Sequence, residues 1–274
     1  MTDGDAASSD TATEANGHSV AVPGGAIYYR TLGSGLPLIL IGGGPSNADT
    51  LTALAEHLTG ARTVVTYDRR GYSRSPLEHP AERASIRRHA DDVRHLIDDL
   101  GAGPASVFAT SFGALIGLEL AAAHPDAVAR MIVHEPPLAQ LVPTDDRTAF
   151  DVNLDDEDAA AALDQIAASI GVTRGRSLTG SGDRPEVRPH DIELFIRRDV
   201  PAIAEYELDL DRLAPLADRI VVTASEEGRA FYPYHCAAAL AAALGTTLIE
   251  LPGNHAAMIT RPLEFAGHLA PLAP

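Results

Sequence analysis

Ser111 lies at a place where a side chain could do chemistry, in the segment VFATSFGALIGL (residues 107–118). It separates a strand-like run from a helix-like run, with Ala109 and Gly113 two positions to either side. A very sharp strand-to-helix turn strains the serine backbone and exposes the hydroxyl, and it leaves room only for small residues at those two positions. A hydroxyl presented in this way can act as a nucleophile when a base lies beside it.

Short apolar runs alternate with helical patterns on both sides of this turn. A hairpin signal at Pro23-Gly24-Gly25 comes first, and strand-like runs follow at 36–42, 62–68, 104–109, 129–134, 219–224 and 246–251. This alternation predicts an α/β fold with a mostly parallel central sheet, helices on both faces and an N-terminal antiparallel hairpin. Ligands bind beyond the carboxyl ends of the strands in such sheets, so Ser111 is expected on that rim.

The segment 138–216 breaks the alternation, because it holds helical patterns and a Gly/Ser/Arg-rich linker but no strand signal. A long insertion of this kind is usually functional. We therefore predict a helical cap at 138–216, a core domain at 18–137 and 217–274, and a disordered acidic tail at 1–17. The cap positions that could line a site, or fill the core of the cap, are Phe150, Phe195, Ile196 and Tyr206.

From about His18 to its end the chain resembles the α/β-hydrolase family, the serine hydrolases with a helical cap. The family's G-x-S-x-G turn reads A-T-S-F-G here, and its H-G-x-P motif reads G-G-G-P, with Gly42 in place of His. The resemblance implies that the backbone N–H groups of Gly44 and Phe112 form the oxyanion hole, and Phe112 opens a helix, where unpaired N–H groups favour negative charge. A further segment, YDRRGYSRS (67–75), resembles the family's D-x-R-G-x-G-x-S loop, which is mainly structural.

The closing segment LPGNHAAM, which contains His255, also matches the family. The resemblance implies that His255 takes the serine proton and returns it to the leaving group. The family's acid comes between the serine and the histidine in the chain, and it holds the histidine tautomer. Two candidates stay open: Glu135, at the end of the run 129–134, and Glu227, in the turn after the run 219–224, with Glu226 third.

The resemblance implies a serine hydrolase that cleaves a small acyl substrate (a carboxylic ester, thioester or lactone) through an acyl-enzyme intermediate. Two alternatives stay open. The same triad supports a C–C bond hydrolase or a cofactor-free perhydrolase or haloperoxidase. The chain could instead be a non-catalytic ligand-binding protein of this fold, which the missing His at Gly42 favours. No metal site or nucleotide motif is visible, so no cofactor is expected.

Composition limits the partners. The net charge is −17, with 38 acidic and 21 basic residues, which argues against nucleic acid and anionic membrane surfaces. The resemblance implies a small-molecule substrate instead. No run approaches the ~18 apolar residues of a membrane span, and the N-terminus lacks the basic start and apolar core of a signal peptide. We therefore predict a cytoplasmic protein. The sequence leaves its substrate and oligomeric state open. The single cysteine, Cys236, lies in an apolar helical pattern and is expected to be a packing residue.

Overall fold

A computed structural model of the chain describes residues 16–79, 83–143, 158–172 and 187–273. These residues build one eight-stranded sheet in the order β1-β2-β4-β3-β5-β6-β7-β8. The strands are β1 (Asn16–Val22), β2 (Gly25–Gly33), β3 (Leu36–Ile41), β4 (Arg62–Tyr67), β5 (Ala105–Thr110), β6 (Val128–His134), β7 (Ile220–Ser225) and β8 (Leu248–Leu251). Strand β2 runs antiparallel to both of its neighbours, and the other pairs are parallel. The predicted parallel sheet with an N-terminal hairpin is therefore confirmed.

The N-terminal edge differs from the sequence-based expectation by two residues. Strand β1 begins at Asn16, which pairs with Thr31 of β2, and Gly17 pairs with Arg30. The acidic, small-residue composition of the opening stretch predicts a tail through residue 17, but backbone pairing to β2 does not require apolar side chains. Residues 1–15 of the predicted tail lie outside the described part of the chain.

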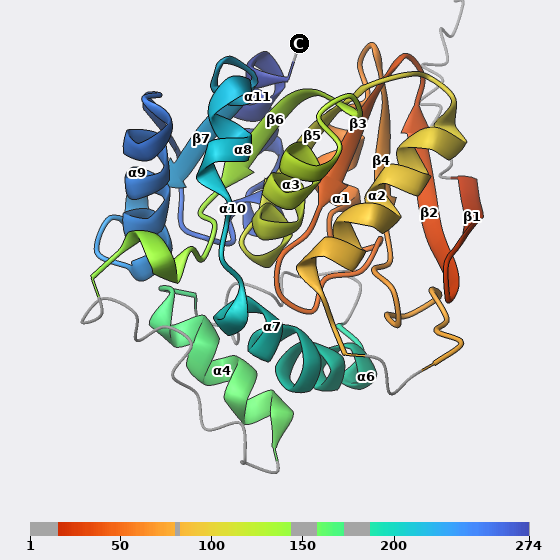
Figure 1. Ribbon diagram of the computed structural model, residues 1–274, viewed down its shortest axis with the longest axis horizontal. Helices are drawn as coiled ribbons and strands as arrows, with labels where there is room; N and C mark the ends of the chain where they lie inside the picture. The colour runs from red at the N-terminus through yellow and green to blue at the C-terminus, as the bar shows by residue number, and fades with distance from the viewer. Residues whose placement is uncertain (1–15, 80–82, 144–157, 173–186, 274) are drawn as a thin grey trace, which may run out of the picture.

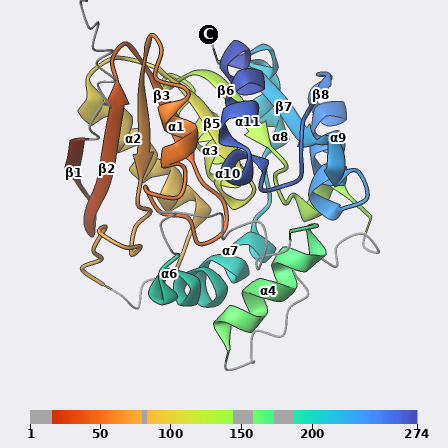
Figure 2. The same cartoon turned by 180° about the vertical axis from the view of Figure 1, so that it is seen from behind.

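Helices cover both faces of the sheet (Figures 1 and 2). One face carries α2 (Ile86–Leu100), α3 (Phe112–Ala123), α8 (Leu210–Leu213) and α9 (Tyr232–Leu244), and the other carries α1 (Thr52–Glu56), α10 (Ala257–Thr260) and α11 (Pro262–Leu269). Successive side chains of a strand point to opposite faces. In β3, Ile39 and Ile41 accordingly join the core beneath α2 and α3, whereas Leu38 and Leu40 join the core beneath α1 and α11.

Helix α2 shows how local sequence sets the bounds of an element. Ser85 is its N-cap, and the Ser85 hydroxyl accepts a hydrogen bond from the Arg88 N–H at 3.4 Å. The helix ends at Gly101, whose φ of 63° is the left-handed conformation that glycine adopts without strain. Ile86, Val93 and Ile97 share one face of the helix and are buried against the sheet side of the molecule.

Between β6 and β7 the described residues form helices and no strand. They are η1 (Ala139–Leu141), α4 (Ala159–Ser169), α6 (Pro189–Leu194), the π-helical η4 (Phe195–Asp199), α7 (Val200–Glu205), α8 and η5 (Ala214–Arg219). Helices α4, α6 and α7 gather beyond one end of the sheet (Figures 1 and 2). That end is the carboxyl end, because α6 and η4 bond to the loop that follows β4. Among the residues described, no helix has both the length and the apolar character needed to cross a membrane.

Candidate active site

Ser111 occupies the turn between β5 and α3 in a strained conformation. Its φ of 54° and ψ of −126° lie in a region that residues other than glycine rarely adopt. The Ser111 N–H donates to the carbonyl of His134 at 2.9 Å, and the Ser111 carbonyl accepts from the Ala114 N–H at 2.8 Å. These bonds hold the sharp turn and fix the serine at the carboxyl edge of the sheet.

The small residue at position 113 has a direct steric reason. A Cβ atom on Gly113 would lie 2.5 Å from the carbonyl oxygen of Ile41 and 2.6 Å from that of Gly42. Helix α3 therefore begins in contact with the backbone at the end of β3, and any side chain at Gly113 would force the two apart. This contact brings the serine turn against the loop after β3.

The glycine loop after β3 lies directly against the serine. A Cβ atom on Gly43 would be 2.6 Å from the Cβ and 3.3 Å from the Oγ of Ser111, and Gly44 has a φ of +49°. On the other side, Phe112 opens α3, where the first N–H groups have no partner within the helix. The structure thus places Gly43, the neighbour of Gly44, against Ser111, and Phe112 directly after it; Gly44 and Phe112 are the two residues expected to bind an oxyanion.

Glu135 and His255 meet although 120 residues separate them in the chain. The His255 Nδ1 lies 2.5 Å from Glu135 Oε2, and the Ser225 N–H donates to Glu135 Oε1 at 2.8 Å. Burial raises the pKa of Glu135, but His255, His134 and the Ser225 N–H outweigh it, so that the pKa falls to about 2. A buried carboxylate therefore stays charged and fixes one nitrogen of the histidine ring.

The two other glutamate candidates lie elsewhere. Glu227 and Glu226 belong to the short η6 turn (Glu226–Gly228) after β7, and both are exposed. Glu227 Oε1 lies 3.2 Å from the guanidinium of Arg261, and each of these two side chains is about half exposed, at 52% and 50%. Of the three glutamates, the structure places only Glu135 beside His255.

His134 is a site residue that sequence reasoning treated only as the end of a strand. The Thr223 hydroxyl donates to the Val133 carbonyl at 3.1 Å, so His134 Nδ1, 3.0 Å away, must donate to that hydroxyl. In the neutral ring that the lowered pKa of His134 implies, the other ring nitrogen accepts from the Ser225 hydroxyl at 3.2 Å. Burial lowers the pKa of His134 to about 4. The nearby His255 lowers it further, and Glu135 acts in the opposite direction without cancelling the effect of burial. In the sequence, the one sign of this role is that a polar residue ends a mostly apolar strand.

His134 also links the serine to the other two groups. Its carbonyl accepts from Ser111, the next residue is Glu135, and its ring centroid lies 6.4 Å from that of His255. Ser111, Glu135 and His255 therefore gather at the carboxyl ends of β5, β6 and β8. A hydroxyl, an imidazole and a charged carboxylate form a set that can carry out acyl transfer. Within the described ranges, no cluster of His, Cys, Asp and Glu side chains could hold a metal ion.

The candidate cap positions fall into three groups. Phe195 and Ile196 are buried, and the Phe195 ring packs 6.1 Å from the ring of Phe112. The Tyr206 hydroxyl donates to Glu119 at 2.9 Å. Burial raises the pKa of Tyr206, and the charge of Glu119 raises it further. Phe150 lies outside the described residues. Phe195 is thus the candidate that contacts Phe112, one of the two residues expected to form the oxyanion hole.

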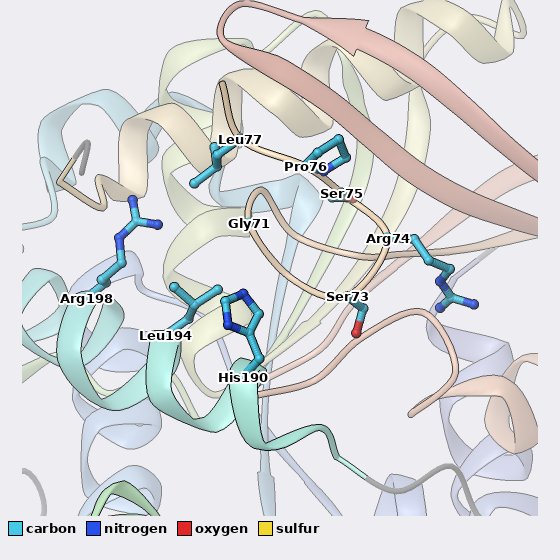
Figure 3. A pocket seen from close by; sticks show the side chains of 9 residues that line it. All are labelled: Gly71, Ser73, Arg74, Ser75, Pro76, Leu77, His190, Leu194 and Arg198. Carbon is cyan, nitrogen blue, oxygen red and sulfur yellow. The ribbon is translucent and has the colours of Figure 1, made fainter. Parts of the chain in front are cut away.

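A pocket of about 420 Å³ lies on the seam between the loop after β4 and helices α6 and η4. Figure 3 shows the side chains of His190 and Leu194 extending from α6 toward the loop of Gly71 to Leu77. The lining includes neither Ser111 nor His255. This pocket therefore marks the boundary between the helical segment and the sheet rather than the catalytic centre.

Comparison with known proteins gives the same picture as the geometry. The family model for the α/β hydrolase fold matches residues 37–183. A hydrolase of Bacillus subtilis (strain 168), YraK, is 33% identical over 267 residues, which cover 93% of this chain and 94% of that protein. The solved structure of an α/β hydrolase from Sphaerobacter thermophilus is 27% identical with a TM-score of 0.70, covering 93% of this chain and 99% of the other. A thermophilic esterase from Thermogutta terrifontis shares the fold, with a TM-score of 0.73 at 19% identity, covering 95% of this chain and 100% of the other.

Proposed function

This chain belongs to the α/β-hydrolase fold family and is a hydrolase-type enzyme, and we propose that it is a serine hydrolase that cleaves a small acyl substrate (a carboxylic ester, thioester or lactone). The observation that carries the proposal is the Glu135–His255 pair at the same sheet edge as the strained Ser111. A charged carboxylate hydrogen-bonded to an imidazole beside an exposed hydroxyl is the arrangement that activates a serine.

In the first half of the proposed reaction, Ser111 Oγ attacks the carbonyl carbon of the substrate. The serine proton passes to His255 Nε2, because Nδ1 already donates to Glu135. The carbonyl oxygen becomes an anion that accepts hydrogen bonds from the Gly44 and Phe112 N–H groups. Removal of one such donor typically costs about 10²–10³ in rate. The tetrahedral adduct then collapses, and the leaving group departs with the proton from His255.

In the second half, a water molecule attacks the acyl group on Ser111 and gives its proton to His255. Collapse of the second adduct releases the carboxylic acid and returns the proton to Ser111 Oγ. The Ser111 hydroxyl makes no hydrogen bond with any residue that the structure describes. The serine–histidine hydrogen bond often tightens only in the substrate complex, so the mechanism requires closure of that contact on binding.

We assign a core and a helical cap to the chain in this proposal. The core, residues 18–137 and 217–274, supplies the nucleophile, base, acid and oxyanion hole. The segment 138–216 acts as a helical cap that bounds the substrate site, supported by the contact of Phe195 with Phe112. Specificity among esters, thioesters and lactones then depends on the cap walls, because the catalytic groups are common to all three.

Labelling with a fluorophosphonate probe tests the proposal, because such probes react with activated serines. The intact protein should label at Ser111, and Ser111→Ala should neither label nor hydrolyse 4-nitrophenyl esters. Ser19→Ala, which removes an exposed serine on β1, is the matched control and should label fully. A wild-type protein that does not label, or that labels at another residue, would refute the proposed nucleophile.

A substrate panel measured against Ser111→Ala then distinguishes the reaction types. It should contain 4-nitrophenyl esters of increasing acyl length, an acyl thioester, a lactone and a C–C bond hydrolase substrate. We expect turnover of at least one ester, thioester or lactone that is lost in Ser111→Ala. Labelling at Ser111 with turnover only of the C–C substrate would contradict the proposed acyl substrate class and favour the alternative use of the same triad.

A further inference from the structure

The loop that forms one side of the proposed oxyanion hole has no side chains of its own, because it consists of Gly42, Gly43 and Gly44. Its three carbonyl groups are nevertheless all held. Arg69 donates to the Gly42 carbonyl at 3.0 Å and also to the Gly44 carbonyl. Between them, the Gly43 carbonyl accepts from the N–H of Ser46 at 3.2 Å and from the Ser46 hydroxyl. Residues outside the glycine run therefore set the orientation of every peptide plane in it.

The direction of the oxyanion donor follows from these bonds. In a trans peptide the C=O of one residue and the N–H of the next point in opposite directions. Because Ser46 holds the Gly43 carbonyl, the Gly44 N–H must point away from Ser46. Arg69 fixes the two peptides that flank this one, so the central peptide cannot rotate alone. Three glycines would otherwise be the most freely rotating backbone in the chain.

The guanidinium of Arg69 is well placed for this task. The side chain is only 2% exposed, and its two terminal nitrogens reach two carbonyls that lie two residues apart. Its Cζ lies 4.3 Å from the centroid of the Tyr72 ring and 4.8 Å from that of Phe112, which carries the other proposed donor. A planar guanidinium can bridge two acceptors and stack on rings at once, which an ammonium cannot do. Arg69 therefore contacts both sides of the proposed oxyanion hole.

The counter-charge for Arg69 comes from the helical segment between β6 and β7. Asp199 Oδ2 lies 3.8 Å from the Arg69 guanidinium and accepts from the Tyr72 hydroxyl at 2.5 Å. His89 Nε2 lies 3.5 Å from the other carboxylate oxygen of Asp199. Asp199 ends the π-helical η4, and π-helical turns often occur at functional sites. A buried charge on this segment thus faces the cation that holds the glycine loop.

We propose that Arg69 is a positioning residue that aims the oxyanion donor of the glycine loop, and that Asp199 couples the seating of the helical cap to that loop through Arg69. This inference rests on the proposed serine hydrolase function and adds to it a group that does not touch the substrate.

Arg69→Lys is the test variant, and Arg70→Lys is its matched control. Arg70 is the next residue, is 4% exposed and pairs with Asp92 through Nε at 2.7 Å, but it bonds to no residue of the glycine loop. Both variants lose a buried bidentate guanidinium, and both should lower the melting temperature. Only Arg69→Lys should lower kcat for a 4-nitrophenyl ester, by about 10- to 100-fold. A donor that points in the wrong direction should reduce the rate by less than the factor of about 10²–10³ that follows removal of a donor. KM should stay within about threefold, because the interaction acts mainly in the transition state.

The inhibition constant of a transition-state analogue is a second measurement, and a change in folding stability alone does not alter it. Phenylboronic acid forms a tetrahedral anion on an activated serine, so its Ki should rise in Arg69→Lys by about the same factor as kcat/KM falls. In Arg70→Lys the Ki should match the wild-type value. Equal kcat and Ki for the two variants would overturn the role of Arg69. A wild-type protein without labelling at Ser111 and without turnover would instead overturn the proposed function, and the inference with it.

Asp199→Asn tests the coupling to the cap, and it keeps the inference open to test if Arg69→Lys does not fold. Asparagine keeps the shape of the side chain and can still accept from Tyr72, but it removes the charge opposite Arg69. We expect Asp199→Asn to lower kcat several-fold in the wild-type background and to have little further effect on kcat in Arg69→Lys, since both changes act through one contact. Wild-type kcat in Asp199→Asn, or losses that multiply independently in the double variant, would overturn the coupling.

Discussion

Replacing Glu135 by glutamine separates the roles of the glutamates at the carboxyl edge. The Glu135 carboxylate accepts two hydrogen bonds, one from His255 Nδ1 at 2.5 Å and one from the Ser225 N–H at 2.8 Å. A glutamine of the same shape offers one acceptor oxygen and one NH2 group. One of its two partners must therefore face a donor instead of an acceptor.

Either orientation of the glutamine harms the site. If the NH2 group faces His255, Nδ1 must become the acceptor, and the proton moves to Nε2, where it blocks transfer from Ser111. If the NH2 group faces Ser225, a buried N–H loses its partner at a cost of about 1–3 kcal/mol, and the charge that stabilises the imidazolium is still absent. Conversion of a triad carboxylate to its amide typically lowers kcat by about 10⁴, so we expect a fall of about 10³–10⁴ in Glu135→Gln.

The assay is steady-state hydrolysis of a 4-nitrophenyl ester at equal concentrations of folded protein, checked by circular dichroism. Glu227→Gln is the control, because Glu227 is half exposed and its ion-pair partner among the described residues is Arg261, at the surface, where such pairs contribute about 0–1 kcal/mol. Its kcat should stay within about twofold of wild type. If Glu135→Gln also kept near wild-type kcat, or if Glu227→Gln were the more damaged variant, the reasoning from the hydrogen bonds of Glu135 would be refuted.

Further predictions concern stability and the serine turn. The pKa of His134 is lowered to about 4 in the folded chain, whereas an unfolded histidine titrates near 6.5. Between these pH values the unfolded state binds a proton that the folded state does not. The free energy of unfolding should therefore fall by about 3 kcal/mol as the pH drops from 6.5 to 4. Urea unfolding across this range should show that slope, and His134→Gln should flatten it; an unchanged slope would contradict the assignment. Because the folded pKa of Glu135 is lowered to about 2, its contribution is present above pH 4.5 and should be lost as the pH falls from there toward 2, a second loss that Glu135→Gln should remove. Gly113→Ala should cost about 1–3 kcal/mol and reduce kcat, because its Cβ would meet the backbone oxygens of Ile41 and Gly42 at 2.5 and 2.6 Å. Gly267→Ala in α11, where a Cβ meets nothing within 4 Å, should instead raise the urea midpoint; equal effects of the two alanines would argue against a steric demand at Gly113.

The sequence by itself determined the architecture, because strands and helices leave periodic patterns of apolar residues that depend on local backbone geometry. The runs at 36–42, 104–109 and 129–134 became β3, β5 and β6, and the hairpin signal at Pro23 and Gly24 became the turn between β1 and β2. The small residue at Gly113 likewise indicated a sharp turn at Ser111 before any contact was known. These are constraints between residues that are close in the chain.

Only the tertiary structure decided which groups meet. Glu135 and Glu227 both follow a strand of the sheet, and nothing in their local sequence shows which one faces His255, since the pairing depends on how β6, β7 and β8 lie side by side and where each loop turns. The part played by Arg69 was hidden for the same reason. Its motif indicated a structural loop, whereas its bonds to Gly42 and Gly44 come from a parallel strand pairing that places the end of β4 beside the end of β3. Contacts between segments far apart in the chain are set by packing and strand order, and a local pattern carries no record of either.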